Sequence, residues 1–82
     1  MNFSVSWTDD ALVSAARLWA VDTAAVRAAT DAAVAALRSD PYHGTTHQSE
    51  GLWRIVVAPV VVCFEIDPVG RRVRIIDVVS AA

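Results

Sequence analysis

The stretch LWRIVVAPVVVCFEI, Leu52 to Ile66, constrains the fold most, because it is a long apolar run with a proline at its centre. Its uncharged part, between Arg54 and Glu65, is about half of the roughly 20 residues that a membrane-spanning helix needs. The proline would interrupt a helix, and the valine and isoleucine residues around it favour strands. The stretch therefore predicts two strands joined at Ala58-Pro59, and not a membrane segment or a buried helix.

A two-residue loop at Ala58-Pro59 would set the pairing of these strands, with Val57 opposite Val60 and Arg54 opposite Cys63. Proline is unfavourable as the second residue of such a loop, so a cis peptide bond, or a longer turn that shifts the pairing, is left open. In this pairing the face directed at the core carries Trp53, Ile55, Val57, Val60, Val62, Phe64 and Ile66. The opposite face carries Leu52, Arg54, Val56, Val61, Cys63 and Glu65.

A turn and a further strand are expected after this hairpin. DPVG at positions 67–70 has the residue preferences of a type I turn, and the alternation of RRVRIIDVV predicts an antiparallel strand over about 71–79. The inward positions of that strand are Val73, Ile75 and Val79, and the outward positions are Arg72, Arg74 and Ile76. The expected pairs across the turn are Ile66 with Arg71, Glu65 with Arg72, and Cys63 with Arg74.

The N-terminal half predicts a strand and two helices. NFSVSW alternates between apolar and polar residues, which indicates a strand over 2–7, and Thr8 is a candidate N-cap for a helix through about Trp19. Asp22 or Thr23 caps a second helix to about Arg38, and the segment 40–51 is expected to be a polar loop. The chain thus predicts a single α+β domain over 1–82, with two layers and the order strand, helix, helix, strand, strand, strand.

Composition excludes some classes of function. Hydrophobic residues make up 55% of the 82 residues and charged residues 20%, so disorder is not expected. The net charge is −2 and all seven basic residues are arginine, so binding to nucleic acid would need a local arginine cluster. A single cysteine fits a reducing compartment, and the first residues have no secretory pattern, so a cytoplasmic protein without a membrane role is expected.

The uncovered face of the predicted sheet is the candidate site. It gathers Arg54, Arg72 and Arg74 with Glu65, and it is bordered by the apolar residues Val56, Val61 and Ile76, with Val78 as a further candidate. Arginine mixed with exposed apolar side chains is typical of a contact surface. A solvated face with weak cross-strand ion pairs explains the same residues equally well.

The order of elements, the phrase LRSDPYHGT at the end of the second helix and the pattern GLWRIVVAPVVVCFEIDPVGRRVRIIDVV resemble the RelE/ParE superfamily of bacterial toxins. The resemblance covers nearly the whole chain. It implies a toxin of a type II toxin-antitoxin system, neutralised by an antitoxin that wraps around it. RelE-like members cleave messenger RNA on the ribosome, and ParE-like members poison DNA gyrase.

The resemblance also bears on individual residues. Trp53-Arg54 matches the aromatic-basic pair that opens a strand in ribonuclease members, so Arg54 is a catalytic candidate. Val56 and Val61 stand where such members carry basic residues, and the basic and aromatic or histidine residues that follow their last strand have no counterpart in DVVSAA. Arg74 is a second catalytic candidate, in a different arrangement of the site, and ribonuclease activity is expected to be weakened, altered or absent.

The remaining candidates are binding residues. On this surface Arg72, Glu65, Val56 and Val61 are candidates for contact with an antitoxin or with RNA. His43 and His47 are candidates in the loop before the hairpin, as substitutes for the missing acid-base residues, and solvation of the loop is the alternative. A metal site formed by these two histidines would lack a third ligand in the sequence, so no metal is expected. No cofactor is expected either. Cys63, placed between two arginines, would have a lowered pKa if they lie close, and a small half-buried side chain is the alternative.

Three functions stay open from the sequence. They are a toxin with weakened or altered ribonuclease activity, a gyrase inhibitor that needs no nuclease residues, and a degenerate member that serves only as a regulatory partner. The expected partner is a cognate antitoxin in each case, with the ribosome and its messenger RNA, or DNA gyrase, as a further target. Formation of an oligomer is also left open.

Overall fold

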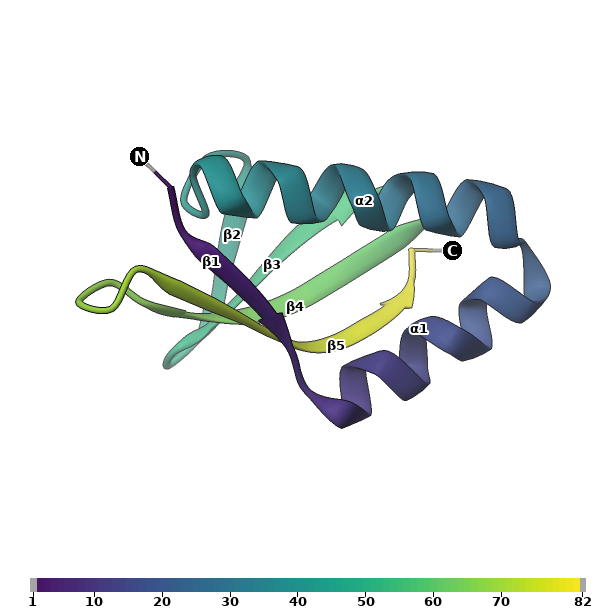
Figure 1. Ribbon diagram of the computed structural model, residues 1–82, viewed down its shortest axis with the longest axis horizontal. Coiled ribbons are helices and arrows are strands. Elements are labelled where there is room, and N and C mark those ends of the chain that lie inside the picture. Colours follow the sequence, from purple (N-terminus) through teal and green to yellow (C-terminus); the bar gives the residue numbers. More distant parts are fainter. Residues whose placement is uncertain (1, 82) are drawn as a thin grey trace.

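The computed structural model describes residues 2–81 and shows a five-stranded sheet covered on one face by two helices (Figure 1). The elements are β1 (Ser4–Trp7), α1 (Asp9–Val21), α2 (Thr23–Ser39), β2 (Thr45–Ser49), β3 (Leu52–Val57), β4 (Val60–Asp67) and β5 (Arg72–Ser80). The two-layer α+β architecture expected from the sequence is confirmed. No helix among residues 2–81 combines the length and the apolar character that crossing a membrane requires.

The strands lie in the order β1-β5-β4-β3-β2. Strand β1 runs parallel to β5, and the other neighbours are antiparallel. Strand β2 was not predicted, because TTHQS lacks the apolar alternation that marks a half-buried strand, and in the structure it is almost wholly exposed. The polar loop expected over 40–51 is therefore wrong in part, since Thr45–Ser49 pairs with β3 at the edge of the sheet.

The predicted pairing of β3 with β4 is confirmed. Val57 pairs with Val60 and Arg54 with Cys63, and the Ala58-Pro59 peptide bond is cis. The inward face of this hairpin packs on the helices, where Ile55, Val62 and Phe64 are buried. Strict alternation of side chains along a strand thus fixed both faces once the loop was located.

The predicted register of β4 and β5 is wrong. The turn lies one residue further along the chain than predicted, so each β4 residue pairs two positions further along β5. Asp67 pairs with Arg72, so the loop consists of Pro68 to Arg71, and Glu65 lies opposite Arg74. The Asp67 carboxylate holds this turn, because Oδ1 accepts the Gly70 N–H at 3.1 Å. Arg71 completes it with φ at 51°, a left-handed conformation that side-chain-bearing residues rarely adopt. The sequence signals marked the turn but not which of its residues still pair.

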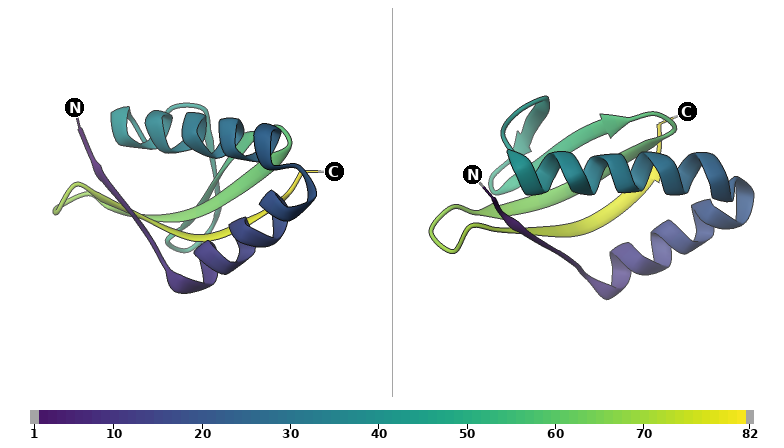
Figure 2. Two further views of the ribbon diagram at one scale, coloured as in Figure 1. Left: turned by 45° about the vertical axis from the view of Figure 1, so that its right-hand side comes forward. Right: turned by 45° about the horizontal axis from the view of Figure 1, so that its top comes forward.

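A bulge in β5 changes the faces beyond this point. Phe64 pairs with Ile75 but Cys63 pairs with Asp77, so one residue of β5 has no partner on β4. Val78 is consequently buried, and Val79 is 40% exposed on the outer face. The prediction that Val79 points inward is wrong for this reason. The prediction that Cys63 lies opposite Arg74 is wrong because the register set by the turn differs from the predicted one, and the bulge displaces it by one more residue. The bulge also bends β5, which curves with the sheet in Figure 2.

Polar contacts at the helix ends position the helices. Thr8 Oγ1 accepts the Ala11 N–H at 3.2 Å as the N-cap of α1 and donates to the Ile75 carbonyl at 3.1 Å. Asp22 caps α2 by accepting the Ala25 N–H at 3.2 Å. The alanine-rich inner sides of the helices then approach the sheet closely, and Ala11, Ala15, Ala29 and Ala33 are all buried.

Candidate functional site

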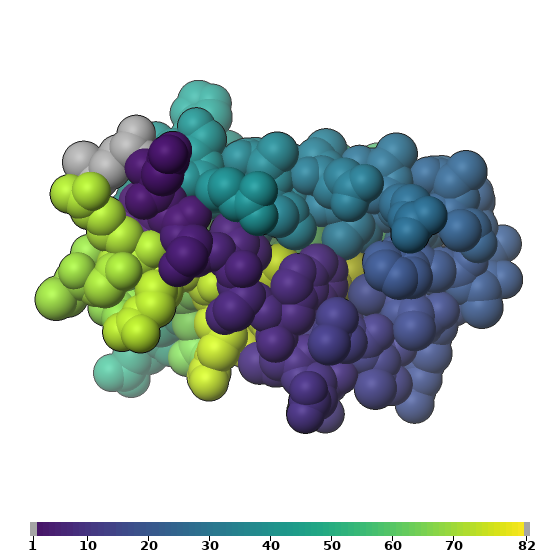
Figure 3. Space-filling model, in the orientation of Figure 1, coloured from purple at the N-terminus to yellow at the C-terminus, as the bar shows by residue number. Residues whose placement is uncertain are grey.

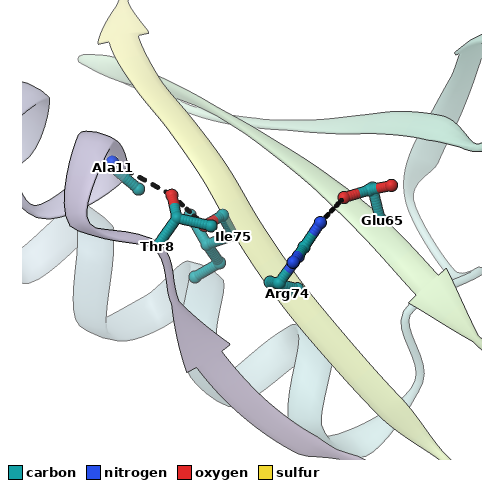
Figure 4. A network of polar contacts seen from close by, with 5 residues as sticks. All are labelled: Thr8, Ala11, Glu65, Arg74 and Ile75. Atoms are coloured by element: carbon teal, nitrogen blue, oxygen red, sulfur yellow. Dashed lines mark hydrogen bonds and ion pairs between the residues drawn. The ribbon is translucent and has the colours of Figure 1, made fainter.

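The outer face of the sheet, opposite the helices, carries two ion pairs near the β4–β5 turn. Arg74 Nη2 donates to Glu65 Oε1 at 2.7 Å, as Figure 4 shows, and Arg72 Nη2 donates to Asp67 Oδ2 at 3.1 Å. All four side chains are substantially exposed, so water and salt screen both pairs and each contributes little to stability. The sequence predicted that Glu65 lies opposite Arg72, whereas in the structure Glu65 pairs with Arg74.

Strand β1 adds hydroxyl groups to this charged area. Ser6 lies beside Arg74 and Ser4 beside Arg72 in the parallel pairing. An open hollow of about 420 Å³ lies here, lined by Ser6, Glu65, Ile66, Asp67, Arg72 and Arg74. The alternation in NFSVSW predicts that both serines point outward. Their position beside the arginines depends on the pairing of β1 with β5, which local sequence does not encode.

The carboxylate of Asp67 is held in its ionised form. The Gly70 N–H and then the Arg72 guanidinium lower the pKa of Asp67 below its ordinary value of 3.8. A Cβ at position 70 would lie 2.7 Å from Arg72 Nε and 2.7 Å from Asp67 Oδ2, so a larger residue there would displace the ends of these two side chains. The turn is therefore built around the ion pair.

The middle of the outer face contains Arg54, Cys63 and Asp77, which follow one another across three strands, with Thr46 beside Arg54 on β2. Burial and then the charge of Asp77 raise the pKa of the Cys63 thiol, and Arg54 opposes this effect in part. The setting with two arginines that would lower this pKa does not exist, because the register of the turn places Arg74 opposite Glu65 and the bulge then places Asp77 opposite Cys63. Cys63 is thus a half-buried thiol that stays protonated at neutral pH.

A row of valines closes the outer face near the β3–β4 turn. Val56, Val61 and Val79 are direct neighbours across three strands, and Val56 is 57% exposed. Val79 belongs to this row in place of Val78, which was the candidate from sequence. Three adjoining β-branched side chains form an apolar surface that has no charge to bind phosphate.

The two histidines are not brought to the outer face. His47 lies opposite Trp53, and their rings are 4.9 Å apart between centroids, so His47 shares the helix-covered face with Trp53. His43 lies in the turn after α2, where its N–H donates to the Asp40 carbonyl at 3.3 Å. Arg54 points to the other face, so the histidines are not positioned for acid-base chemistry beside it. Among residues 2–81 no three His, Cys, Asp or Glu side chains gather as metal ligands do.

A second hollow lies between the two helices and β1 (Figure 3). Its volume is about 480 Å³, and its walls include Trp7, Leu12, Trp19 and Val34, with Asp31 on the rim. Leu12 is 49% exposed, and the Trp19 Nε1 atom is buried without a hydrogen-bond acceptor in the described part of the chain. A buried donor without an acceptor carries a cost in stability. No role was predicted for Trp19, and this hollow was not predicted, because it depends on how the two helices pack against β1.

Comparisons with known proteins concern the fold. No protein-family model and no curated protein matches the chain. Solved structures do match over 98% of this chain. One is a chain of the RelBE2 toxin-antitoxin complex from Mycobacterium tuberculosis, with a TM-score of 0.84, 18% identity and 99% of its length covered.

Two further structures agree with this match. A chain of the archaeal RelE-RelB complex from Pyrococcus horikoshii OT3 has a TM-score of 0.75, 12% identity and 96% of its length covered. A chain of the chromosomal ParDE system from P. aeruginosa has a TM-score of 0.72, 18% identity and 97% of its length covered. The chain therefore has the fold of the RelE and ParE toxins, as the resemblance in its sequence predicted.

Proposed function

We propose that this protein is the toxin, or a toxin-like component, of a type II toxin-antitoxin pair and that a cognate antitoxin binds and neutralises it. The observation that carries the proposal is the match to a chain of the RelBE2 toxin-antitoxin complex, which covers nearly all of both chains. The hollow between the helices and β1 supports it, since exposed Leu12 and the other apolar side chains of its walls suit a bound protein segment. A cytoplasmic location is part of this proposal, because its targets would lie there.

The activity of the toxin is proposed to differ from that of an active RelE-like ribonuclease. Arg72 and Arg74 are engaged by carboxylates, and the outer face has valine at positions 56 and 61. Arg54 forms no ion pair or hydrogen bond with a described side chain, so it keeps its charge available for a phosphate. If the protein cleaves messenger RNA on the ribosome, Arg54 and Arg74 stabilise the charge of the transition state, at reduced rate.

Inhibition of DNA gyrase is the second candidate. It is favoured by the exposed row of Val56, Val61 and Val79, which suits contact with a protein better than contact with RNA. A gyrase inhibitor also needs none of the acid-base residues that the outer face lacks. A regulatory partner without its own target remains the third function, and the experiment below separates the three.

The test is induction of the chain in a bacterial host, with and without the reading frame adjacent to its gene. Growth arrest that the adjacent product relieves, together with co-purification of the two proteins, is the expected result. Pulse-labelling of protein synthesis and a gyrase supercoiling assay then separate the two targets. Normal growth at verified soluble expression, with co-purification retained, would leave the regulatory role. Normal growth without a bound partner would contradict the proposal.

A further inference from the structure

Two neighbouring rows of side chains form an open patch on the outer face of the sheet, near the β3–β4 turn. Each row takes one residue from β3, one from β4 and one from β5. The rows of this outer-face patch are Val56, Val61 and Val79, and then Arg54, Cys63 and Asp77. The helices cover only the other face of the sheet (Figure 1). The patch therefore combines an exposed apolar row with a row that carries charge.

The charged row holds two opposite charges that do not meet. Arg54 and Asp77 lie on either side of Cys63, each about 4.8 Å from it, the spacing of neighbouring strands. Neither forms an ion pair with another residue in the described part of the chain. The Asp77 Oδ1 atom accepts the Val78 N–H at 2.9 Å, which fixes the position of this carboxylate. A positive and a negative group thus flank a neutral centre, and both are available to a partner.

A second copy of the chain complements this arrangement. A two-fold axis along β4, between two sheets packed face to face, places β3 of one protomer over β5 of the other, because these strands lie on opposite sides of β4. Arg54 of each protomer then faces Asp77 of the other, so the same ion pair forms twice. An axis across the strands would place like charges over each other or place both charges over valine. A wholly acidic or wholly basic partner would match only one of the two groups.

The same axis also pairs the apolar row with itself. It places Val56 of one protomer over Val79 of the other and brings the two copies of Val61 together, so the exposed valines cover each other. Both the charges and the apolar side chains are thus satisfied by one symmetric contact.

We propose that the outer-face patch is the interface of a symmetric homodimer of this chain, in which two reciprocal ion pairs between Arg54 and Asp77 flank paired valines. The inference goes beyond the proposed antitoxin pair, because it concerns the chain without its partner. It also means that self-association covers Arg54, so the free protein masks its own outer face as its concentration rises.

The size of the patch sets the strength of the dimer. Stable interfaces use roughly 20–30 residues a side, so a contact centred on these two rows is expected to have a Kd of roughly 10–100 μM. Cys63 lies on the axis, but packed sheets are about 10 Å apart, whereas a disulfide needs Cα atoms about 5.5–6 Å apart. The dimer is therefore expected in reducing buffer, without a disulfide.

The test is sedimentation velocity of the purified chain in reducing buffer, from about 1 to 300 μM. The wild type is expected to pass from monomer to dimer over this range. Arg54→Asp and Asp77→Arg each make both contacts repulsive, so each is expected to raise the dimer Kd about tenfold or more. Arg17→Asp and Asp31→Arg, the same changes at exposed helix positions, are the matched controls and should alter the Kd by less than about twofold.

Mixing the two charge variants gives a result that only this geometry predicts. In a heterodimer of an Arg54→Asp chain with an Asp77→Arg chain, both contacts again join opposite charges. The equimolar mixture is therefore expected to dimerise with a Kd within about threefold of the wild type, although neither variant does so alone. A change in the folding of one chain does not produce this rescue, since the two substitutions are in different molecules.

Chemical modification tests the same interface without a substitution. Cys63 is the single thiol of the chain, and alkylation with a bulky maleimide places two adducts on the axis. The alkylated protein is expected to remain monomeric over the whole concentration range. This measurement decides the matter if a charge variant fails to fold, which circular dichroism detects.

Several results would overturn the inference. A wild-type chain that stays monomeric throughout would do so, as would a dimer that survives alkylation of Cys63 or folded charge variants that do not associate on mixing. A loss of the dimer in Asp31→Arg equal to that in Asp77→Arg would assign the interface to the helices. A monomeric chain whose Cys63 is protected from alkylation by the product of the adjacent reading frame would assign the patch to the antitoxin.

Discussion

Removal of the Thr8 hydroxyl is expected to destabilise the protein by about 1–2 kcal/mol. Thr8 Oγ1 makes two bonds in one place, accepting the Ala11 N–H at 3.2 Å and donating to the Ile75 carbonyl at 3.1 Å (Figure 4). Loss of an N-cap costs about 1 kcal/mol, and loss of the second bond up to about 1 kcal/mol. The second cost is limited, because the Thr8 N–H also donates to the Ile75 carbonyl at 3.0 Å and survives the change.

The measurement is thermal and urea unfolding of the wild type and three variants. Thr8→Ala is expected to lower Tm by roughly 4–16 °C for a domain of this size. Thr8→Ser keeps both bonds and is expected to stay within about 0.5 kcal/mol of the wild type. Thr8→Asp keeps the cap but cannot donate to Ile75, so it should lie between them. Equal stability of the alanine and serine variants would refute the reasoning, because the two differ in this hydroxyl.

The other predictions concern the outer face. Replacing Arg54 and Arg74 together by alanine should change stability by less than about 1 kcal/mol while growth arrest is lost; a collapse of Tm would mean that these residues face the core. Alkylation of Cys63 should require higher pH than a free cysteine, and Asp77→Asn should move the rate profile to lower pH, since that carboxylate raises the thiol pKa; an unchanged profile would contradict this. The folded pKa of Asp67 is lowered, so its stabilisation is present above about pH 4 and is lost as pH falls through the folded pKa. Asp67→Asn should therefore flatten acid unfolding measured by circular dichroism, and an identical curve would refute the assignment.

Local pattern was enough to predict part of the site. The alternation in LWRIVV and VVVCFE fixed which side chains face the helices, so Arg54, Val56 and Val61 were placed correctly on the outer face. These assignments need only the period of a strand and the position of one turn. Both are properties of neighbouring residues, which a single sequence contains.

What failed depended on pairing between distant segments. The bulge in β5 arises from the fit of two strands and the core beneath them, so it moved Val79 outward and Asp77 beside Cys63 without a local signal. Strand β2 forms because β3 offers it an edge, although TTHQS has little preference for a strand face. The position of Ser6 beside Arg74 depends likewise on β1 finding β5 across most of the chain.

The parallel pairing of β1 with β5 has a consequence for how the chain is made. Thr8 and Ile75, which close that pairing, are separated by 67 positions in sequence. During synthesis β1 and the inner side of α1 therefore wait for a strand that is translated much later, and closing so long a loop slows folding. Because β5 lies between β1 and β4, these two parts of the sheet can join only after β5 has been translated, and the part of the outer face that carries Arg74 forms with it.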